Sequence, residues 1–496
     1  MENVTQNTAV LVKEHRGGSR WYIIEDGQDA DIRKDELPLT HPLAKRLLGK
    51  KVGDKVVVSE GLQKKEGTIQ EVKSKYVDAL HKSAAMFESY FPDAQGFSFL
   101  NLTMVTNPDA EEKVDFSPLF DMVDRQHQHV TQVLALYKTG QLTIGAVAKL
   151  LHKNPIEAWG LLINKPDIGV RCAIGDPQEL ADVRRVLTTE HPRLVADITT
   201  LMTLHGLEVA NDVVELFRKI AIAQSTIDQL TDLITRRKGI GARGYMTVGK
   251  EGEAYVKEEI TAEQLQKNTA YLQTMFDWIQ HNCEVIACEE ALTLASVQRQ
   301  KLYDLFGADA IDSVLLAKQE KRVFLSEDER LRNFAKNSYG VDGAWTQALL
   351  EQLLSKGKLD TRTYQKVVIK LINSNYHHTR ITADTLEEAA KQSAWKPDRQ
   401  FEKVASVLSG GNSDDFSAVM VASDFIYKLY TQQFFLADPR ILLFAILDLL
   451  FTSREKASIL LAQLINHIRG RFVWLPAQQT EIVQLILNWA RSKALF

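Results

Sequence analysis

The stretch PRLVADITTLMTLHG, residues 192–206, decides the fold of the central part of this chain. Its apolar run, Leu194 to Ala196, is typical of a short buried strand, and the run ends at a carboxylate, Asp197. A helix-like apolar pattern follows directly. A charge that closes a buried strand is costly unless a partner compensates for it, so the function of this region depends on what Asp197 faces.

Two further segments repeat the apolar run, RKIAIA at 218–223 and RVFLS at 322–326, and helical segments separate the three. Alternation of buried strands with helices predicts a parallel sheet that is covered on both faces. Ligands of such sheets bind beyond the carboxyl ends of the strands. We therefore expect Asp197 to meet Asp328, which follows the third strand in RVFLSEDERLR, at one edge of the sheet.

Two more acids are candidates for the same edge, Asp312 in GADAIDSVLLAKQ and Asp228 in IAIAQSTIDQLTDLI. Three or four carboxylates in one cleft repel one another unless a cation neutralises them. Hard oxygen ligands suit Mg²⁺ or Mn²⁺, and such a site activates water for attack on a phosphodiester. Taken singly, each acid could instead cap a helix or remain a solvated charge.

At these residues the sequence resembles a family. Residues 193–390 are similar to a PIN-domain nuclease, the fold of the VapC-type toxin ribonucleases, through the segments LVADITTLMTLHG, AIDSVLLA and FLSEDERLR. The resemblance implies a metal-dependent endoribonuclease that uses Mg²⁺ or Mn²⁺. It assigns catalytic and metal-binding roles to three aspartates and supporting roles to two hydroxyls: Asp197, Asp312 and Asp328, with Thr199 and Ser326.

The sequence departs from the family at the second acid, where a glutamate is usual and this chain has Gln229. Asp228 is its neighbour but lies about 100° round the helix, and we retain it as the weakest member of the catalytic set. Gln229 favours an alternative hypothesis, in which a degenerate PIN-like domain is part of a non-catalytic scaffold. A structure-specific DNA nuclease is a third hypothesis.

An insertion at about 237–285 interrupts the PIN-like region. It contains GIGARG at 239–244, which matches GxGxxG, but the segment follows a helix and precedes a strand, the reverse of the dinucleotide-binding order. The basic residues beside it could contact RNA phosphates, although a solvated loop explains them equally well. These basic residues are Arg236, Arg237, Lys238 and Arg243.

The N-terminal region is rich in β-type runs such as AVLV, WYII and KVVV. Residues 40–58, THPLAKRLLGKKVGDKVVV, and residues 67–77, GTIQEVKSKYV, resemble the C-terminal, FKBP-like domain of the Gre transcript-cleavage factors. In that family this domain docks on RNA polymerase. The resemblance does not extend to the Gre coiled coil, so it implies docking rather than transcript cleavage; a scaffold that has lost this partner is the alternative.

Composition places the chain among soluble cytoplasmic proteins. Its 496 residues carry a net charge of −4, which argues against a general electrostatic nucleic-acid binder, and its three cysteines fit a reducing compartment. The longest apolar run, ILLFAIL at 441–447, is too short to span a membrane. The predicted organisation is a Gre-like module (1–80), a linker (81–117), a helical segment (118–190), a PIN-like α/β/α domain (191–390) and an all-helical region (391–496).

These observations lead to one main hypothesis. The chain is a PIN-type endoribonuclease that acts on RNA and is brought to RNA polymerase or nascent transcripts by its N-terminal module. Such an architecture suits bacterial anti-phage defence. The apolar helices at 416–496 would form a bundle that offers a surface to a regulator or a second copy. The main alternative is a non-catalytic, polymerase-binding regulatory scaffold.

Overall fold

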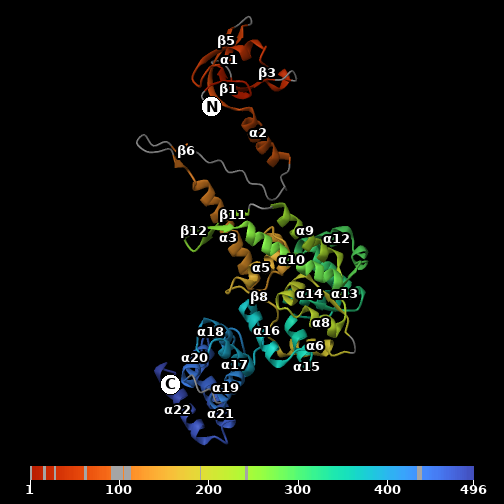
Figure 1. The fold of residues 1–496 in the computed structure, drawn as a ribbon, viewed down its shortest axis with the longest axis vertical. Helices are drawn as coiled ribbons and strands as arrows, with labels where there is room; N and C mark the ends of the chain where they lie inside the picture. Colours follow the sequence, from red (N-terminus) through yellow and green to blue (C-terminus); the bar gives the residue numbers. More distant parts are fainter. Residues whose placement is uncertain are drawn as a thin grey trace. The chain divides into compact units, whose positions relative to one another are not determined.

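The structure is a computed structural model that describes residues 3–14, 18–26, 30–60, 64–90, 104–105, 113–189, 192–240, 244–432 and 438–495. The chain divides into two compact units, Met1–Pro118 and Leu119–Phe496, and Figure 1 labels many of their elements.

The first unit is built on a five-stranded sheet, as the β-rich pattern predicts. The strand order is β3-β2-β1-β5-β4, and β1 pairs antiparallel with both β2 and β5. A short helix, α1 (Pro42–Leu47), begins with Pro42 at its first position and buries its apolar side chains in the core of this sheet. The strands are β1 (Thr8–Glu14), β2 (Ser19–Glu25), β3 (Glu36–Pro38), β4 (Lys55–Glu60) and β5 (Lys64–Ser74).

A helix leaves this sheet where a linker is predicted. Helix α2 (Lys75–Tyr90) follows β5 directly, so the predicted boundary at residue 80 falls inside a helix. Beyond it the described residues include a short antiparallel pair, β6 (Met104–Val105) and β7 (Lys113–Val114). Residues 91–103 and 106–112 of the predicted linker lie outside the described residues.

The second unit begins with helices, as the periodicity of this segment predicts. Thr143 caps α4 through its hydroxyl, and Asn154 caps α5 in a reciprocal arrangement with Glu157. Both helices therefore have well-defined first turns. The elements of this segment are α3 (Ser117–Lys138), α4 (Ile144–Leu150), α5 (Pro155–Ile163), β8 (Val170–Arg171) and α6 (Pro177–Leu187).

The centre of this unit is a parallel sheet in the order β13-β10-β9-β14-β15. The three strands predicted from apolar runs form its middle: β9 (Leu194–Ala196), β10 (Ile220–Ala223) and β14 (Val323–Leu325). The edge strands β13 (Cys283–Ile286) and β15 (Gly343–Ala344) were not predicted, because one is partly exposed and the other has two residues.

Helices cover both faces of this sheet, as predicted. In β9, Leu194 and Ala196 face one core while Val195 faces the other, the alternation that a strand imposes. Helices α13 and α14 contribute to the second core. The surrounding helices are α7 (Ile198–Gly206), α8 (Ala210–Phe217), α9 (Gln224–Ile240), α10 (Ala262–Asn282), α11 (Glu290–Thr293), α12 (Ser296–Phe306), α13 (Ala308–Gln319), α14 (Glu329–Tyr339), α15 (Thr346–Ser355), α16 (Thr361–Asn373) and α17 (Ala383–Gln392).

The predicted insertion contains a two-stranded hairpin, β11 (Tyr245–Glu251) and β12 (Ala254–Ile260), followed by α10. After β16 (Tyr376–His377) the described part of the chain is helical throughout, which confirms the predicted all-helical region. Its helices are α18 (Arg399–Ala405), α19 (Asp415–Thr431), α20 (Pro439–Leu450), α21 (Ala457–Arg471) and α22 (Pro476–Ser492). Among the described helices none is long and apolar enough to cross a membrane.

Candidate active site

The carboxylate of Asp197 closes β9 and caps the helix that follows. It accepts hydrogen bonds from the Thr200 N–H at 2.9 Å and the Thr199 hydroxyl at 2.7 Å. The side chain is buried, and desolvation raises the pKa of Asp197 while these hydrogen bonds, together with one from Ser326, oppose the rise. The fold therefore fixes the orientation of a buried carboxyl group at Asp197.

Asp328 occupies the equivalent position after β14, because β9 and β14 pair in parallel with Leu325 opposite Ala196. It caps α14 through the Leu331 N–H at 3.1 Å, and its own N–H donates to the Ser326 hydroxyl at 3.0 Å. Its second oxygen accepts the N–H of Ile144. Burial raises the pKa of Asp328 to about 7, and the negative charge of Asp197 adds to the rise.

The structure brings Asp309, not Asp312, to this edge. Asp312 accepts a hydrogen bond from the hydroxyl of Tyr303 at 2.6 Å. Asp309, one turn earlier on α13, is buried, and desolvation followed by the charge of Asp197 raises its pKa to about 7. No hydrogen-bond donor among the described residues reaches its Oδ1 atom. Asp309 is thus a buried acid that interacts with Asp197 and has one oxygen unpartnered within the described part of the chain, and the sequence reasoning missed it.

A second missed acid, Glu327, lies between the strand end and Asp328. Its carboxylate accepts the N–H of Thr346 at 2.9 Å and the hydroxyl of the same residue, and its own N–H donates to Thr199 at 3.2 Å. Burial raises the pKa of Glu327 to about 7. The nearby buried cation is Arg332, which donates to the carbonyl oxygens of Ser326 and Cys172, each at 2.8 Å. Arg332 offsets part of the negative charge of this edge.

The two predicted α9 residues do not join the acids. Asp228 is exposed and accepts a hydrogen bond from Gln224 on its own helix at 2.9 Å. The side-chain oxygen and carbonyl oxygen of Gln229 both accept hydrogen bonds from the Nδ2 of Asn154, each at 3.0 Å. Gln229, at the position where the resemblance to the PIN family places the second acid, therefore binds the residue that caps α5.

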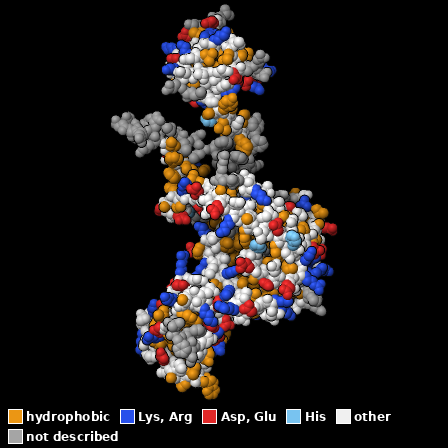
Figure 2. All heavy atoms as spheres, in the orientation of Figure 1, with side chains coloured by type: hydrophobic (Ala, Val, Ile, Leu, Met, Phe, Trp, Pro, Cys, Tyr) orange, Lys and Arg blue, Asp and Glu red, His pale blue; other side chains and the backbone are white. Residues whose placement is uncertain are grey.

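The predicted RNA-binding residues lie at the end of α9. Arg236 pairs with Asp232 at 2.9 Å, and Lys238 donates to Gln273 at 3.1 Å. Arg237 is partly buried and belongs to the last turn of the helix, and Arg243 lies outside the described residues. On the face drawn in Figure 2, basic and acidic side chains of the second unit are interspersed. A role for these residues in RNA binding stays a prediction.

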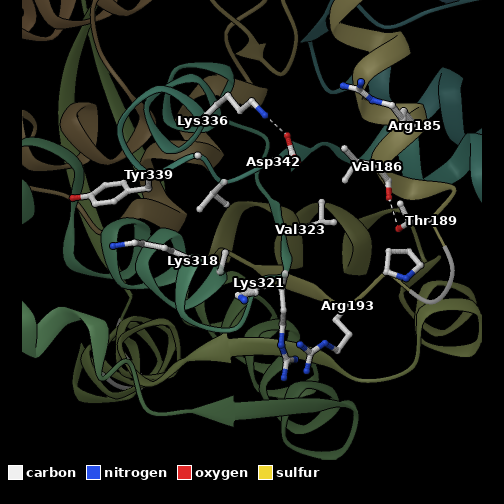
Figure 3. Close-up of a pocket in the computed structure, with 15 residues that line it drawn as sticks. Arg185, Val186, Thr189, Arg193, Lys318, Lys321, Val323, Lys336, Tyr339 and Asp342 are labelled. Carbon is white, nitrogen blue, oxygen red and sulfur yellow. Dashed lines mark hydrogen bonds and ion pairs between the residues drawn. The ribbon is translucent and has the colours of Figure 1, made fainter.

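A cavity of about 720 Å³ lies near the start of β9 and β14, and several Lys and Arg side chains line it (Figure 3). Several of its basic residues have acidic or carbonyl partners: Lys336 pairs with Asp342 at 2.5 Å, and Arg193 donates to the carbonyl of Glu320 at 2.8 Å. The C-terminal ends of three helices, α6, α13 and α14, also line it, and helix C-termini favour cations. The paired basic residues therefore compensate acidic side chains and helix C-termini of this unit.

The donor chemistry of the acidic edge fits a hard divalent cation, because its buried oxygens come from Asp197, Asp309 and Asp328. The Oδ1 atom of Asp309, which has no hydrogen-bond partner among the residues that the structure describes, could serve as a ligand of such an ion. However, no three His, Cys, Asp or Glu side chains in the described ranges are arranged to hold a metal ion. Asp328 instead directs its oxygens to the N–H groups of Leu331 and Ile144.

One family model matches the region that carries these acids. Residues 195–337 match the model of a family described as the PIN domain associated with the TPR-GreAB-C-PIN system. No curated protein and no solved structure matched the chain. The matched segment begins in β9 and ends in α14, so it contains the strand ends and helices that carry the buried acids. Residues 195–337 of this chain are therefore a PIN domain of the kind associated with that system.

Proposed function

We propose that this protein is a metal-dependent endoribonuclease of the PIN type. The observation that carries the proposal is the burial of three aspartates at one edge of the sheet, where Asp197, Asp309 and Asp328 are 2%, 3% and 4% exposed. Burying like charges together is costly, and a fold retains such an arrangement where a cation compensates for it. PIN domains commonly bind Mg²⁺ or Mn²⁺, which suits these oxygen ligands.

In this proposal Asp197, Asp309 and Asp328 would hold the ion, with Asp309 in the role that the sequence assigns to Asp312. When bound, the ion supplies charge neutralisation and polarises a water for attack on phosphorus. Thr199 fixes the orientation of Asp197 through a 2.7 Å hydrogen bond. The hydroxyl of Ser326 bonds the backbone of Asp328 and thereby fixes the turn that presents it.

The N-terminal unit would direct this activity to transcription. Its sheet and α1 contain the segments that resemble the Gre C-terminal domain, and the description of the matched family names a GreAB-C component. Docking of this unit on RNA polymerase would place nascent RNA within reach of the nuclease. Such targeting suits a cytoplasmic enzyme of bacterial anti-phage defence.

The experiment that tests the enzymatic proposal is cleavage of end-labelled RNA by the full chain in Mn²⁺, with EDTA and Asp197→Asn as controls. Cleavage that both controls abolish supports the proposal. A DNA flap substrate beside the RNA decides between a ribonuclease and a structure-specific DNA nuclease. Co-purification of the full chain with RNA polymerase tests the docking role separately.

A second candidate function is a non-catalytic, polymerase-binding regulatory scaffold. Gln229 favours it, because its hydrogen bonds to Asn154 use the position of the family's second acid for a structural contact. Calorimetric titration with Mn²⁺ distinguishes the two functions. A scaffold that needs no metal leaves the titration flat and the RNA intact, with polymerase binding unchanged.

A further inference from the structure

Helix α4 lies directly over the proposed active site. The N–H of Ile144, the first residue of α4, donates to the Oδ2 atom of Asp328 at 2.5 Å. The two residues are 184 positions apart in the chain, so this is a tertiary contact between α4 and the PIN domain. The side chain of Ile144 is itself buried, as is the carboxylate that it covers.

The next residue of α4, Gly145, approaches the PIN domain closely. A Cβ atom added to Gly145 would lie 1.7 Å from the carbonyl oxygen of Phe306, at the junction between α12 and α13. That junction leads into Asp309, whose Oδ1 would lie 3.2 Å from a Cβ added to Gly307. Only a glycine allows α4 to come this near to the backbone that presents Asp309.

The start of α5 and the residue after β8 attach the same segment to other parts of the PIN domain. Asn154 at the start of α5 binds Gln229 with two 3.0 Å hydrogen bonds. Beyond α5, the carbonyl oxygen of Cys172 accepts a 2.8 Å hydrogen bond from Arg332. The segment from α4 to Cys172 is therefore attached to the PIN domain at α9 and α14 as well as at Asp328.

This arrangement explains why the acids are assembled but do not form a metal site. The Oδ2 atom of Asp328 accepts a hydrogen bond from the first amide of α4. The lone pair that accepts this hydrogen bond cannot bind a metal ion at the same time. Substrate is excluded too, because all three aspartates are almost completely buried. We infer that α4, latched by the Ile144–Asp328 bond and the Asn154–Gln229 pair, is an autoinhibitory cover that must move before metal and RNA enter.

The inference rests on the proposed nuclease function and adds its regulation. The first test compares two glycine substitutions in the full chain. Gly145→Ala forces α4 away from Phe306, whereas Gly160→Ala in α5 is the matched control because nothing lies within 4 Å of the added Cβ. We expect Gly145→Ala to bind Mn²⁺ about 10- to 100-fold more tightly, the range that loss of a charge-assisted hydrogen bond implies.

A second pair of variants tests the latch if Gly145→Ala does not fold. Ile144→Pro removes the N–H that binds Asp328, and proline is well tolerated at the first position of a helix. The preceding residue, Thr143, already has the extended backbone that proline requires, with φ −86° and ψ 166°. Ile144→Ala is the control, since it shortens the same side chain but keeps the N–H.

Hydrogen exchange of the α4 amides measures opening independently of chemistry. Faster exchange in Gly145→Ala or Ile144→Pro, with tighter Mn²⁺ binding and faster RNA cleavage than in the matched controls, supports the cover. Faster exchange with the Mn²⁺ affinity and cleavage rate of the wild type overturns the cover but leaves the nuclease proposal standing. An opened α4 with no Mn²⁺ binding in any variant shows that the acids are not a metal site, and overturns both.

Discussion

Replacing Asp309 by asparagine should stabilise the metal-free protein, and the gain should grow with pH. Asp309 is buried, its Oδ1 has no donor among the described residues, and its pKa is raised to about 7 from an ordinary value of 3.8. A carboxyl whose folded-state pKa is raised contributes stability below its unfolded pKa. That contribution is lost as the pH rises through the folded pKa. Asparagine has the same shape and does not titrate in either state.

The size of the effect follows from these two pKa values. Between pH 5 and pH 7 the unfolded chain holds Asp309 ionised while the folded chain keeps its proton, so each pH unit costs about 1.4 kcal/mol. Above pH 7 both states are ionised and the cost levels off. The stabilisation by Asp309→Asn should therefore increase by about 3 kcal/mol between pH 5 and pH 8.

The assay is urea unfolding in EDTA at pH 5, 6, 7 and 8, for wild type, Asp309→Asn and Asp228→Asn. Asp228 is exposed and provides the control for loss of one negative charge at the surface. Addition of Mn²⁺ at pH 8 should offset most of this increase, because 100-fold excess over the dissociation constant stabilises the wild type by about 2.7 kcal/mol. A difference between Asp309→Asn and wild type that stays constant from pH 5 to pH 8 would refute the reasoning.

Four further predictions concern the same edge. Asp197→Asn should leave the fold intact and lower RNA cleavage at least about 100-fold, because loss of a residue that only hydrogen-bonds a metal ligand already costs up to that factor. Circular dichroism checks the fold, and activity near that of the wild type would exclude Asp197 as a ligand. Thr199→Val removes the 2.7 Å hydrogen bond to Asp197 and should weaken Mn²⁺ binding about 10- to 100-fold in calorimetry, with Thr199→Ser retaining the affinity. Asp312→Asn should leave Mn²⁺ affinity unchanged, because Asp312 is bound to Tyr303; a large loss would restore the sequence-based assignment over Asp309. Uptake of Mn²⁺ should release about 1.5 protons at pH 6.5 and almost none at pH 8.5, because Asp309 and Asp328 both have a pKa of about 7 and must ionise to bind the ion; calorimetry in buffers of different ionisation enthalpy counts these protons.

The sequence predicted the middle of the sheet because its strands are uniformly apolar and each is followed by a recognisable helix start. Asp197 and Asp328 could be placed at one edge for the same reason, as residues that follow parallel neighbours. The two-residue strand β15 and the half-exposed strand β13 have no such pattern. They are strands because the central strands offer them hydrogen bonds, and this information lies in the fold rather than in their own residues.

The third acid could not be chosen from periodicity. Asp309 and Asp312 are three residues apart, so both lie near the same face of one helix. Their distinct environments depend on where α13 begins, at Gly307 with φ 91°, and on Tyr303, which approaches from α12 and binds Asp312. The signal that was available is that GADAIDS contains two acids, and that the earlier one follows a glycine able to turn the chain into the helix.

The contact between α4 and Asp328 could not be predicted from a local sequence pattern, because the two residues are 184 positions apart. It is compatible with the glutamine at position 229. A closed, dry site must bury its negative charges without a cation, and each additional carboxylate raises that cost. In the structure an amide N–H compensates Asp328, and the raised pKa of Asp309 favours its protonated form. A glutamate at residue 229 would introduce one more charge where Asn154 must attach α5. The glutamine is thus as well explained by a site that spends time closed as by a site that has lost its activity.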